Sequence, residues 1–246
     1  MILDHLTIFA VLLVAYFVRG LTGFGSGLIS VPLLALWQPL QLVVPLVMVL
    51  DFIASFILGG VNTKQTDWSE IKRLLPFGVI GASFGVFALL RFPSDPVLFT
   101  LGCFTIFFGI RNALGMQPQG HISALWAVPT GLIGSGAGAL FGTSAPPYII
   151  YLTHRLADKT TVRATFSWLF VLDGGFRLIL FFAAGLLLQR QTQNAIAMGL
   201  VPMMAGLYIG NRVHVNITRE RMVQVIGWIL VGSGGSLILK VLLQGG

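Results

Sequence analysis

Residues 19–32 read Arg-Gly-Leu-Thr-Gly-Phe-Gly-Ser-Gly-Leu-Ile-Ser-Val-Pro, with glycine at positions 20, 23, 25 and 27. Residues 131–138 read Gly-Leu-Ile-Gly-Ser-Gly-Ala-Gly and repeat the same glycine spacing, with Pro146 and Pro147 shortly after. Glycine tolerates positive φ and lets the backbone approach another group closely, so each cluster predicts a loop that breaks regular structure. Close helix packing is the simpler explanation, but it does not need four glycines in eight residues.

Further features recur in the same order after each cluster. A Val-Leu-Asp triplet ends at Asp51 in the first half and at Asp173 in the second. Each half then has a proline followed by two glycines four residues apart, at Pro76, Gly81 and Gly85 and at Pro202, Gly206 and Gly210. For these later glycines, close packing of membrane helices is the favoured explanation. The ordered series predicts an internal repeat, residues 1–118 and 119–246, within one transmembrane domain.

Composition fixes the class of protein. Of 246 residues, 56% are hydrophobic and 9% are charged, and the mean hydropathy is +0.90. A soluble domain has about 25% charged residues, so this chain is predicted to be an all-α integral membrane protein, a polytopic helical bundle. Six ordinary spans are expected, at residues 42–60, 74–90, 96–114, 164–188, 195–211 and 222–243.

The two glycine clusters lie in apolar segments of a different kind, residues 5–38 and 121–152. Each segment is too long for one untilted span of about 20 residues and too short for two spans. Two half-helices that meet at a glycine loop would fit this length. Each half of the chain is therefore predicted to contain one broken segment and three ordinary transmembrane helices.

Basic residues indicate how the broken segments lie, because cytoplasmic loops carry an excess of Lys and Arg. If each broken segment is a re-entrant hairpin, one side of the membrane holds Lys64, Lys72, Arg73, Arg111, Arg155, Lys159, Arg163, Arg212, Arg219 and Arg221. The other side then holds Arg91, Arg190 and Lys240. Full crossings would instead divide the basic residues almost evenly. The sequence thus predicts re-entrant hairpins, inverted repeats, and both termini on the extracytoplasmic side.

Inverted repeats with broken helices are typical of secondary transporters, whose site lies near the bilayer midplane. Irregular backbone at that depth is tolerated where protein or a cavity surrounds it, so the two glycine loops are expected to face each other across the site. The predicted substrate-binding residues are Arg19, Gly23, Gly25, Ser26 and Gly27, then Gly134, Ser135, Gly136, Gly138 and Ser144, together with Arg177. Half-helix N-termini beyond the loops would add N–H donors.

Two arginines lie within apolar segments rather than in loops, Arg19 and Arg177. Asp173 lies one helical turn before Arg177, so an ion pair is expected there. Asp51 is the candidate partner of Arg19. One interpretation is that both pairs are structural. The other is that the planar guanidinium groups bind the oxygens of an anion such as a carboxylate, sulfite or sulfonate. Proton uptake by either aspartate would couple transport to the proton gradient.

The stretch from Arg19 to Pro32 and its second copy resemble the TauE/SafE family of anion permeases, and length and duplicated plan agree with that family. The resemblance implies a bacterial inner-membrane permease, often an exporter, for sulfite, sulfoacetate or another organosulfonate. The second copy has Thr130 where the first has Arg19, so an anion site is not expected to be symmetric.

Other classes of function fit less well. An enzyme is not expected, because the four histidines lie at membrane edges or in loops and Ser144 therefore has no membrane-embedded histidine to serve as its base. One cysteine and scattered histidines show no metal-ligand spacing and no phosphate-loop motif occurs, so neither metal nor other cofactor is expected. The net charge of +7 reflects loop orientation in the lipid bilayer rather than nucleic-acid binding. A passive anion channel, a transporter of small carboxylates and a structural subunit remain alternatives.

Overall fold

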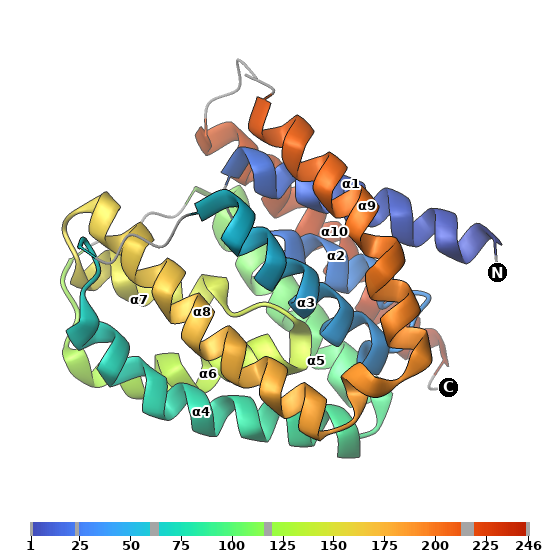
Figure 1. Cartoon of the computed structure of the whole chain (residues 1–246), viewed down its shortest axis with the longest axis horizontal. Helices are drawn as coiled ribbons and strands as arrows, with labels where there is room; N and C mark the ends of the chain where they lie inside the picture. The colour runs from blue at the N-terminus through green and yellow to red at the C-terminus, as the bar shows by residue number, and fades with distance from the viewer. Residues whose placement is uncertain (1, 23–24, 60–63, 116–119, 213–218, 245–246) are drawn as a thin grey trace.

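The computed structural model describes residues 2–22, 25–59, 64–115, 120–212 and 219–244. All regular elements in these ranges are helical, and they form the bundle shown in Figure 1. The α-helices are α1 (Ile2–Thr22), α2 (Ser26–Leu34), α3 (Leu40–Gly59), α4 (Trp68–Arg91), α5 (Ser94–Ala113), α6 (Ala127–Phe141), α7 (Ala145–Arg155), α8 (Lys159–Ala183), α9 (Arg190–Arg212) and α10 (Arg219–Gln244). Two 3-10 turns are η1 (Ala124–Trp126) and η2 (Leu186–Leu188).

Within the described ranges, six helical stretches are long and apolar enough to cross a membrane, namely Leu40–Ile57, Trp68–Arg91, Ser94–Ala113, Ala124–Phe141, Lys159–Ala183 and Val223–Leu243. Five of them coincide with predicted spans and confirm the polytopic helical fold. The predicted span 195–211 is helical as α9, but it is less apolar and is not one of the six. The sixth stretch is instead Ala124–Phe141, in the first part of the second broken segment.

Helices from the two halves of the chain pack against each other. α1 packs along α9, α4 along α6, α5 along α10, and α3 contacts α8. Glycines allow the close approach: a Cβ atom built on Gly206 would lie 2.6 Å from the carbonyl oxygen of Leu13, and one on Gly85 would lie 2.6 Å from that of Gly136. Gly81 and Gly210 meet facing backbone just as closely. The predicted packing role of these four glycines is confirmed.

Both broken segments consist of two helices around a short interruption, and the second helix packs back against the first. The first interruption includes Gly25, whose φ of 98° is left-handed. The second includes Gly142, with a φ of 68°. A side chain with a Cβ atom is strained in this region, so glycine is required at both places.

The position of the second break corrects the sequence-based expectation. Glycines 131, 134, 136 and 138 do not form a loop but lie inside α6, and the chain breaks later, at residues 142–144. Gly131 and Gly136 serve packing instead, because both face α4: a Cβ atom on Gly131 would lie 2.7 Å from the carbonyl oxygen of Leu74. In the first cluster, Gly20 belongs to α1 and Gly27 to α2.

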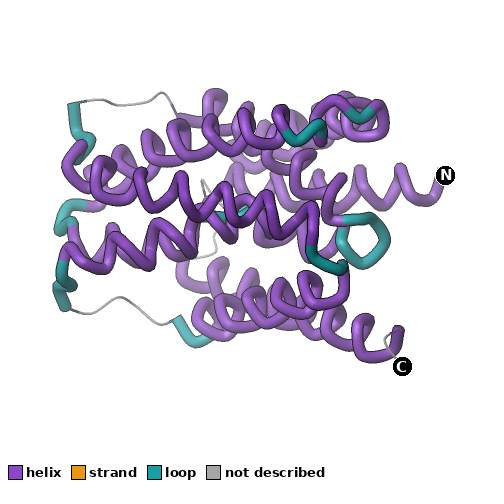
Figure 2. Tube along the Cα trace, turned by 90° about the horizontal axis from the view of Figure 1, so that it is seen from below, coloured by secondary structure: helices purple, strands orange, loops and turns teal. Residues whose placement is uncertain are grey.

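Near one end of the bundle, α10 contacts the end of α2. α1 begins and α10 ends at the same end of the bundle (Figure 2). Near that end, Lys240 of α10 donates hydrogen bonds to the carbonyl oxygens of Ala35 (3.2 Å) and Leu36 (2.9 Å), just beyond the C-terminus of α2. A cation is stabilised near the negative, C-terminal end of a helix dipole. Lys240 therefore fastens α10 to the end of α2.

Candidate functional site

The first polar cluster in the apolar interior is centred on Asp51 of α3, whose exposed fraction is 5%. Its Oδ1 atom lies 2.7 Å from Arg19 Nη1. The same oxygen accepts hydrogen bonds from Tyr16 Oη (2.7 Å) and Ser26 Oγ (2.6 Å). A buried carboxylate is stable only when it is paired and hydrogen-bonded, and these contacts join α1, α2 and α3 around it.

Arg19 has further partners in this cluster. Its Nη1 donates to Ser26 Oγ (2.9 Å), and its Nη2 donates to Ser55 Oγ (2.7 Å) and to the carbonyl oxygen of Asp51 (3.1 Å). Only Nε of this guanidinium is buried without a partner. The predicted Arg19–Asp51 ion pair is therefore present and almost fully saturated with hydrogen bonds.

The second cluster is centred on Asp173 of α8. Arg177, on the next turn, places Nη2 3.0 Å from Asp173 Oδ2, and both side chains are at most 1% exposed. Ser135 Oγ of α6 donates to Asp173 Oδ1. Arg177 Nη2 also donates to Ser144 Oγ, in the second break, over 3.1 Å. The predicted Asp173–Arg177 pair is present too, and it joins α6, α8 and the break.

Phe170 lies between the two clusters. The guanidinium carbon of Arg19 and that of Arg177 are each 5.9 Å from the centre of its ring. A cation within about 6 Å of an aromatic ring is attracted by the ring quadrupole. The ring thus links the arginine of the first half to the arginine of the second.

The start of α2 contacts the second break. A Cβ atom built on Gly27 would lie 2.5 Å from the carbonyl oxygen of Gly142, and one on Gly142 would lie 2.8 Å from Val31 Cγ2. Both ion pairs are thus close to one meeting point of α2 with the end of α6. The expectation was that the two glycine clusters would face each other as loops, but the second cluster is helical, and the residues that meet α2 are those of the later break.

The remaining predicted residues occupy different places. Gly134 faces the ring of Tyr148, and Gly138 faces the guanidinium of Arg177, so both lie at the second cluster. Gly136 faces Gly81 of α4 and belongs to a helix contact. Gly25 shapes the first break, and Gly23 lies outside the described residues.

Tyr16, Ser55, Phe170 and Tyr148 were not predicted as site residues. A tyrosine, serine or phenylalanine in an apolar run carries no charge that singles it out. Tyr16 precedes Arg19 by three residues and so shares its helix face, which was the available signal. Phe170 precedes Asp173 by the same spacing.

The half-helix N-termini are unequal. α2 starts at Ser26, inside the first cluster, so its N–H groups and positive dipole end point toward that site. α7 starts at Ala145, followed by Pro146 and Pro147, which have no N–H group. The second break therefore offers fewer backbone donors than the first, and side chains supply the polar contacts there.

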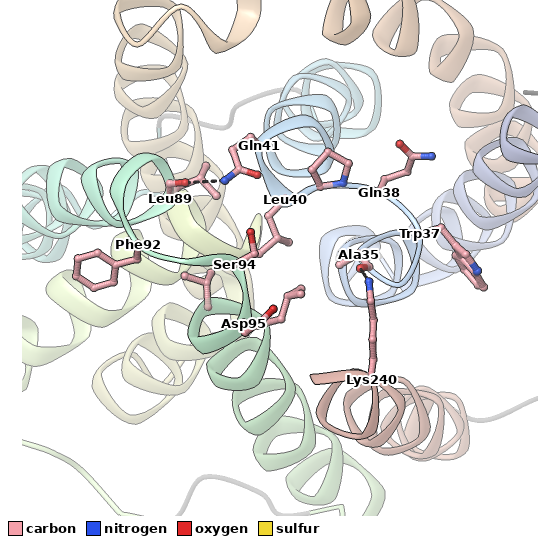
Figure 3. Close-up of a pocket in the computed structure, with 13 residues that line it drawn as sticks. Ala35, Trp37, Gln38, Leu40, Gln41, Leu89, Phe92, Ser94, Asp95 and Lys240 are labelled. Carbon is pink, nitrogen blue, oxygen red and sulfur yellow. Dashed lines mark hydrogen bonds between the residues drawn. The ribbon is translucent and has the colours of Figure 1, made fainter. Parts of the chain in front are cut away.

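Two cavities lie apart from these clusters. One, of about 250 Å³, lies between the α2–α3 turn, the α4–α5 turn and α10, with Gln41, Asp95 and Lys240 in its wall (Figure 3). The other, of about 390 Å³, lies between α1, α9 and Gln38 and is mostly apolar. Neither is lined by a predicted site residue, so both clusters are closed off from these cavities.

Among the described residues, no group of three or more His, Cys, Asp or Glu side chains is placed to hold a metal ion. A further ionic cluster in the described part of the chain is centred on Glu70. This carboxylate pairs with Arg73 (2.6 Å) and Arg155 (2.8 Å) and accepts a hydrogen bond from Tyr151 (2.6 Å). The cluster ties α4 to α7.

Comparison with known proteins gives three findings. The family described as "Sulfite exporter TauE/SafE" matches residues 8–237. The "Probable inner membrane transporter protein TsaS" of Comamonas testosteroni is 28% identical over 194 residues, which cover 78% of this chain and 81% of that protein. No solved structure matches the chain.

Proposed function

The chain belongs to the TauE/SafE family of membrane transporters, and we propose that it is a secondary transporter that exports a small oxyanion such as sulfite, sulfoacetate or another organosulfonate. The observation that carries the proposal is the pair of buried arginines, one from each half, on one phenylalanine ring at the meeting point of two helix breaks. A charged residue at this depth is costly, and such residues usually mark the substrate path of a membrane protein.

The internal ion pairs suggest how an anion would bind. Asp51 neutralises Arg19, and Asp173 neutralises Arg177, when no anion is present. Each aspartate meets its arginine through one carboxylate oxygen, whereas an oxyanion can offer two oxygens to the planar guanidinium, so the two compete for it. Protonation of an aspartate would release its arginine to the anion, and this is how proton coupling would arise.

The packing supports alternating access with inverted repeats. The pairs α1 with α9 and α4 with α6 each join a broken segment of one half to an ordinary helix of the other. We propose that residues 1–118 and 119–246 form the two repeats and that both broken segments are re-entrant. We also propose that both termini lie on the extracytoplasmic side of the inner membrane. Rocking of one repeat against the other would then expose the site to each side in turn.

A passive anion channel and a transporter of small carboxylates are the alternatives. An open channel requires a continuous path, whereas both arginines here are buried, with exposed fractions of 6% and 0%. The enclosed site favours a carrier. The guanidinium groups alone do not distinguish a carboxylate from a sulfonate.

Flux into proteoliposomes tests the proposal. Uptake of sulfite, sulfoacetate, thiosulfate, sulfate and acetate is measured with and without a pH gradient, for wild type, Arg19→Ala and Arg177→Ala. Arg190→Ala is the control, because Arg190 is exposed at the start of α9. We expect saturable flux of a sulfur oxyanion. The control variant should keep this flux, and a buried-arginine variant should lose it. Non-saturating flux would favour a channel, and absence of flux for every anion would refute the transport proposal.

A further inference from the structure

The two clusters differ in how completely their polar atoms are paired. In the first, Nε of Arg19 is the one buried side-chain nitrogen or oxygen that lacks a hydrogen-bond partner. In the second, four such atoms lack one: Tyr148 Oη, Arg177 Nε, Arg177 Nη1 and Asp173 Oδ2. Asp173 Oδ2 is within ion-pair distance of Arg177, yet it accepts no hydrogen bond. Buried polar groups are normally hydrogen-bonded, so four unpaired atoms in one place require an explanation.

The chain is built differently around the second cluster. Tyr16 and Arg19 lie six and three residues before Thr22, the last residue of α1. Ser135 and Gly138 lie six and three residues before Phe141, the last residue of α6. At the same distance from the helix end, the second half thus has a serine where the first has the tyrosine that donates to the aspartate, and a glycine where the first has the arginine. The second half supplies its arginine from α8 instead, beside the additional hydroxyl group of Tyr148.

Tyr148 is placed to reach the same ligand as Arg177. Its side chain is 1% exposed. A Cβ atom built on Gly78 of α4 would lie 3.1 Å both from Tyr148 Oη and from Asp173 Oδ1, so the hydroxyl and the carboxylate share one neighbourhood. Gly134 leaves room for the tyrosine ring, with a built Cβ 3.0 Å from two of its atoms. Glycines on α4 and α6 therefore let Tyr148 and Asp173 lie directly against helix backbone.

We infer that the second cluster is the oxyanion subsite, in which Arg177 and Tyr148 donate hydrogen bonds to the anion while Asp173 accepts one from it. The inference rests on the proposed transport function and deepens it. The first cluster, whose hydrogen bonds are almost all made, then holds α1, α2 and α3 together. Three donor groups, namely Nε and Nη1 of Arg177 and the Tyr148 hydroxyl, suit the several oxygens of one small anion.

The carboxylate of Asp173 narrows the class of ligand. While Asp173 is ionised, the Asp173–Arg177 pair has no net charge, and an anion beside Asp173 Oδ2 is repelled unless it can donate a hydrogen to that oxygen. The subsite therefore takes an oxyanion that itself carries an O–H group, such as hydrogensulfite or a hydroxyalkanesulfonate. An alkanesulfonate such as methanesulfonate, or fully ionised sulfoacetate, has acceptor oxygens only and is disfavoured at this subsite, which narrows the proposed substrates.

Calorimetric titration of the purified full chain in detergent tests the subsite with sulfite and methanesulfonate as probes. Tyr148→Phe is expected to weaken sulfite binding about tenfold, because one hydrogen bond to a charged ligand is lost. Its unfolding temperature is expected to stay near that of wild type, since the Tyr148 hydroxyl lies close to Asp173 and Ser135 but makes no well-formed hydrogen bond to either. Tyr208→Phe, on the exposed face of α9, is the control for affinity.

Two further comparisons make the test specific. Tyr16→Phe removes a hydrogen bond to Asp51 and is expected to lower the unfolding temperature, unlike Tyr148→Phe. Arg177→Lys keeps the charge, loses the planar fork and is expected to weaken sulfite binding strongly. Wild type is expected to bind methanesulfonate at least tenfold more weakly than sulfite.

The outcomes separate this inference from the transport proposal. Equal sulfite affinity of wild type and Tyr148→Phe, with flux intact in wild type, would overturn the subsite and leave the transport function standing. Equal affinity for methanesulfonate and sulfite would overturn the requirement for an O–H group. Wild type that binds no oxyanion of the transport panel would overturn both the subsite and the transport proposal.

Discussion

The guanidinium group of Arg177 occupies the space next to Gly138, where a larger residue has no room. A Cβ atom built on Gly138 would overlap Arg177 Nη1 and would lie 2.7 Å from its Cζ. Arg177 cannot move away easily, because Nη2 is held by Asp173 and Ser144. Gly138 therefore determines whether this arginine fits.

Gly138→Ala should abolish anion flux while the protein still inserts into the membrane. The added methyl group displaces the guanidinium from Ser144 and Asp173, and both ends of the ion pair then lose their geometry. Flux in proteoliposomes measures the effect. Gly235→Ala is the matched control, because a Cβ atom on Gly235 of α10 meets nothing within 4 Å. Normal flux in Gly138→Ala would show that the position of Arg177 is not critical.

Asp51→Ala should destabilise the fold by about 3–5 kcal/mol, because it leaves a buried arginine without its counter-ion. Arg19, Tyr16 and Ser26 all lose their shared acceptor. The measurement is the free energy of unfolding in mixed detergent micelles. The double variant Asp51→Ala with Arg19→Met should recover part of the loss, and a double variant as unstable as the sum of the single ones would argue against the pairing.

Phe170→Leu should lower stability and alter both arginine sites together. The ring interacts with two guanidinium groups, and each cation–π contact contributes about 0.5–2 kcal/mol. A double-mutant cycle of Phe170→Leu with Arg19→Met, and another with Arg177→Met, measures the two couplings by thermal unfolding. Zero coupling energy in both cycles would show that the ring only fills space.

The proposed topology predicts that an enzyme active only outside the cytoplasm will be active when fused after residue 246. The reason is the excess of Lys and Arg in the loops at the opposite end of the bundle. A fusion after Arg155, between α7 and α8, is the counterpart and should be inactive. The reverse pattern of activities would show that the whole bundle has the opposite orientation in the membrane.

Asp67 should stabilise the start of α4 by about 1 kcal/mol at neutral pH. Burial raises the pKa of this carboxyl, but hydrogen bonds from the Ser69 side chain and from the N–H groups of Glu70 and Ser69 lower it more, and the pKa ends below its ordinary value of 3.8. The stabilisation is thus present above that value and is lost as the pH falls through the lower pKa of the folded state. Unfolding of wild type and Asp67→Ala should differ at pH 7 and converge in acid.

The charged part of the site could be predicted from the sequence because charge is rare in an apolar chain. Arg19 and Arg177 stand out in runs of Leu, Val and Phe, and the spacing of Asp173 from Arg177 is one helical turn. Asp51 was found because it ends a Val-Leu-Asp triplet that matches the one ending at Asp173. The helical spans followed from hydropathy for a similar reason, since a lipid environment accepts few alternatives to a helix.

The second break and the uncharged site residues could not be predicted as easily. A cluster of glycines looks the same whether it lines a turn or a helix–helix contact, and in α6 it lines contacts with α4 and Arg177. The true break was marked by Gly142, followed by Ser144 and two prolines, which is a helix-start signal. Tyr148 and Phe170 matter because of their neighbours in three dimensions, which local spacing does not reveal.

The pairing of early helices with late ones bears on how the protein is made. α1 is synthesised first, yet its close partner α9 begins only at Arg190, and Lys240 reaches Ala35 from the final helix. Within the first half, Arg19 already has Asp51, so the first hairpin can insert with its charge neutralised. The helices that pack against this hairpin, α9 and α10, are nevertheless made only late in translation. A nonsense codon late in the gene would therefore unsettle the N-terminal hairpin as well as remove the last helix.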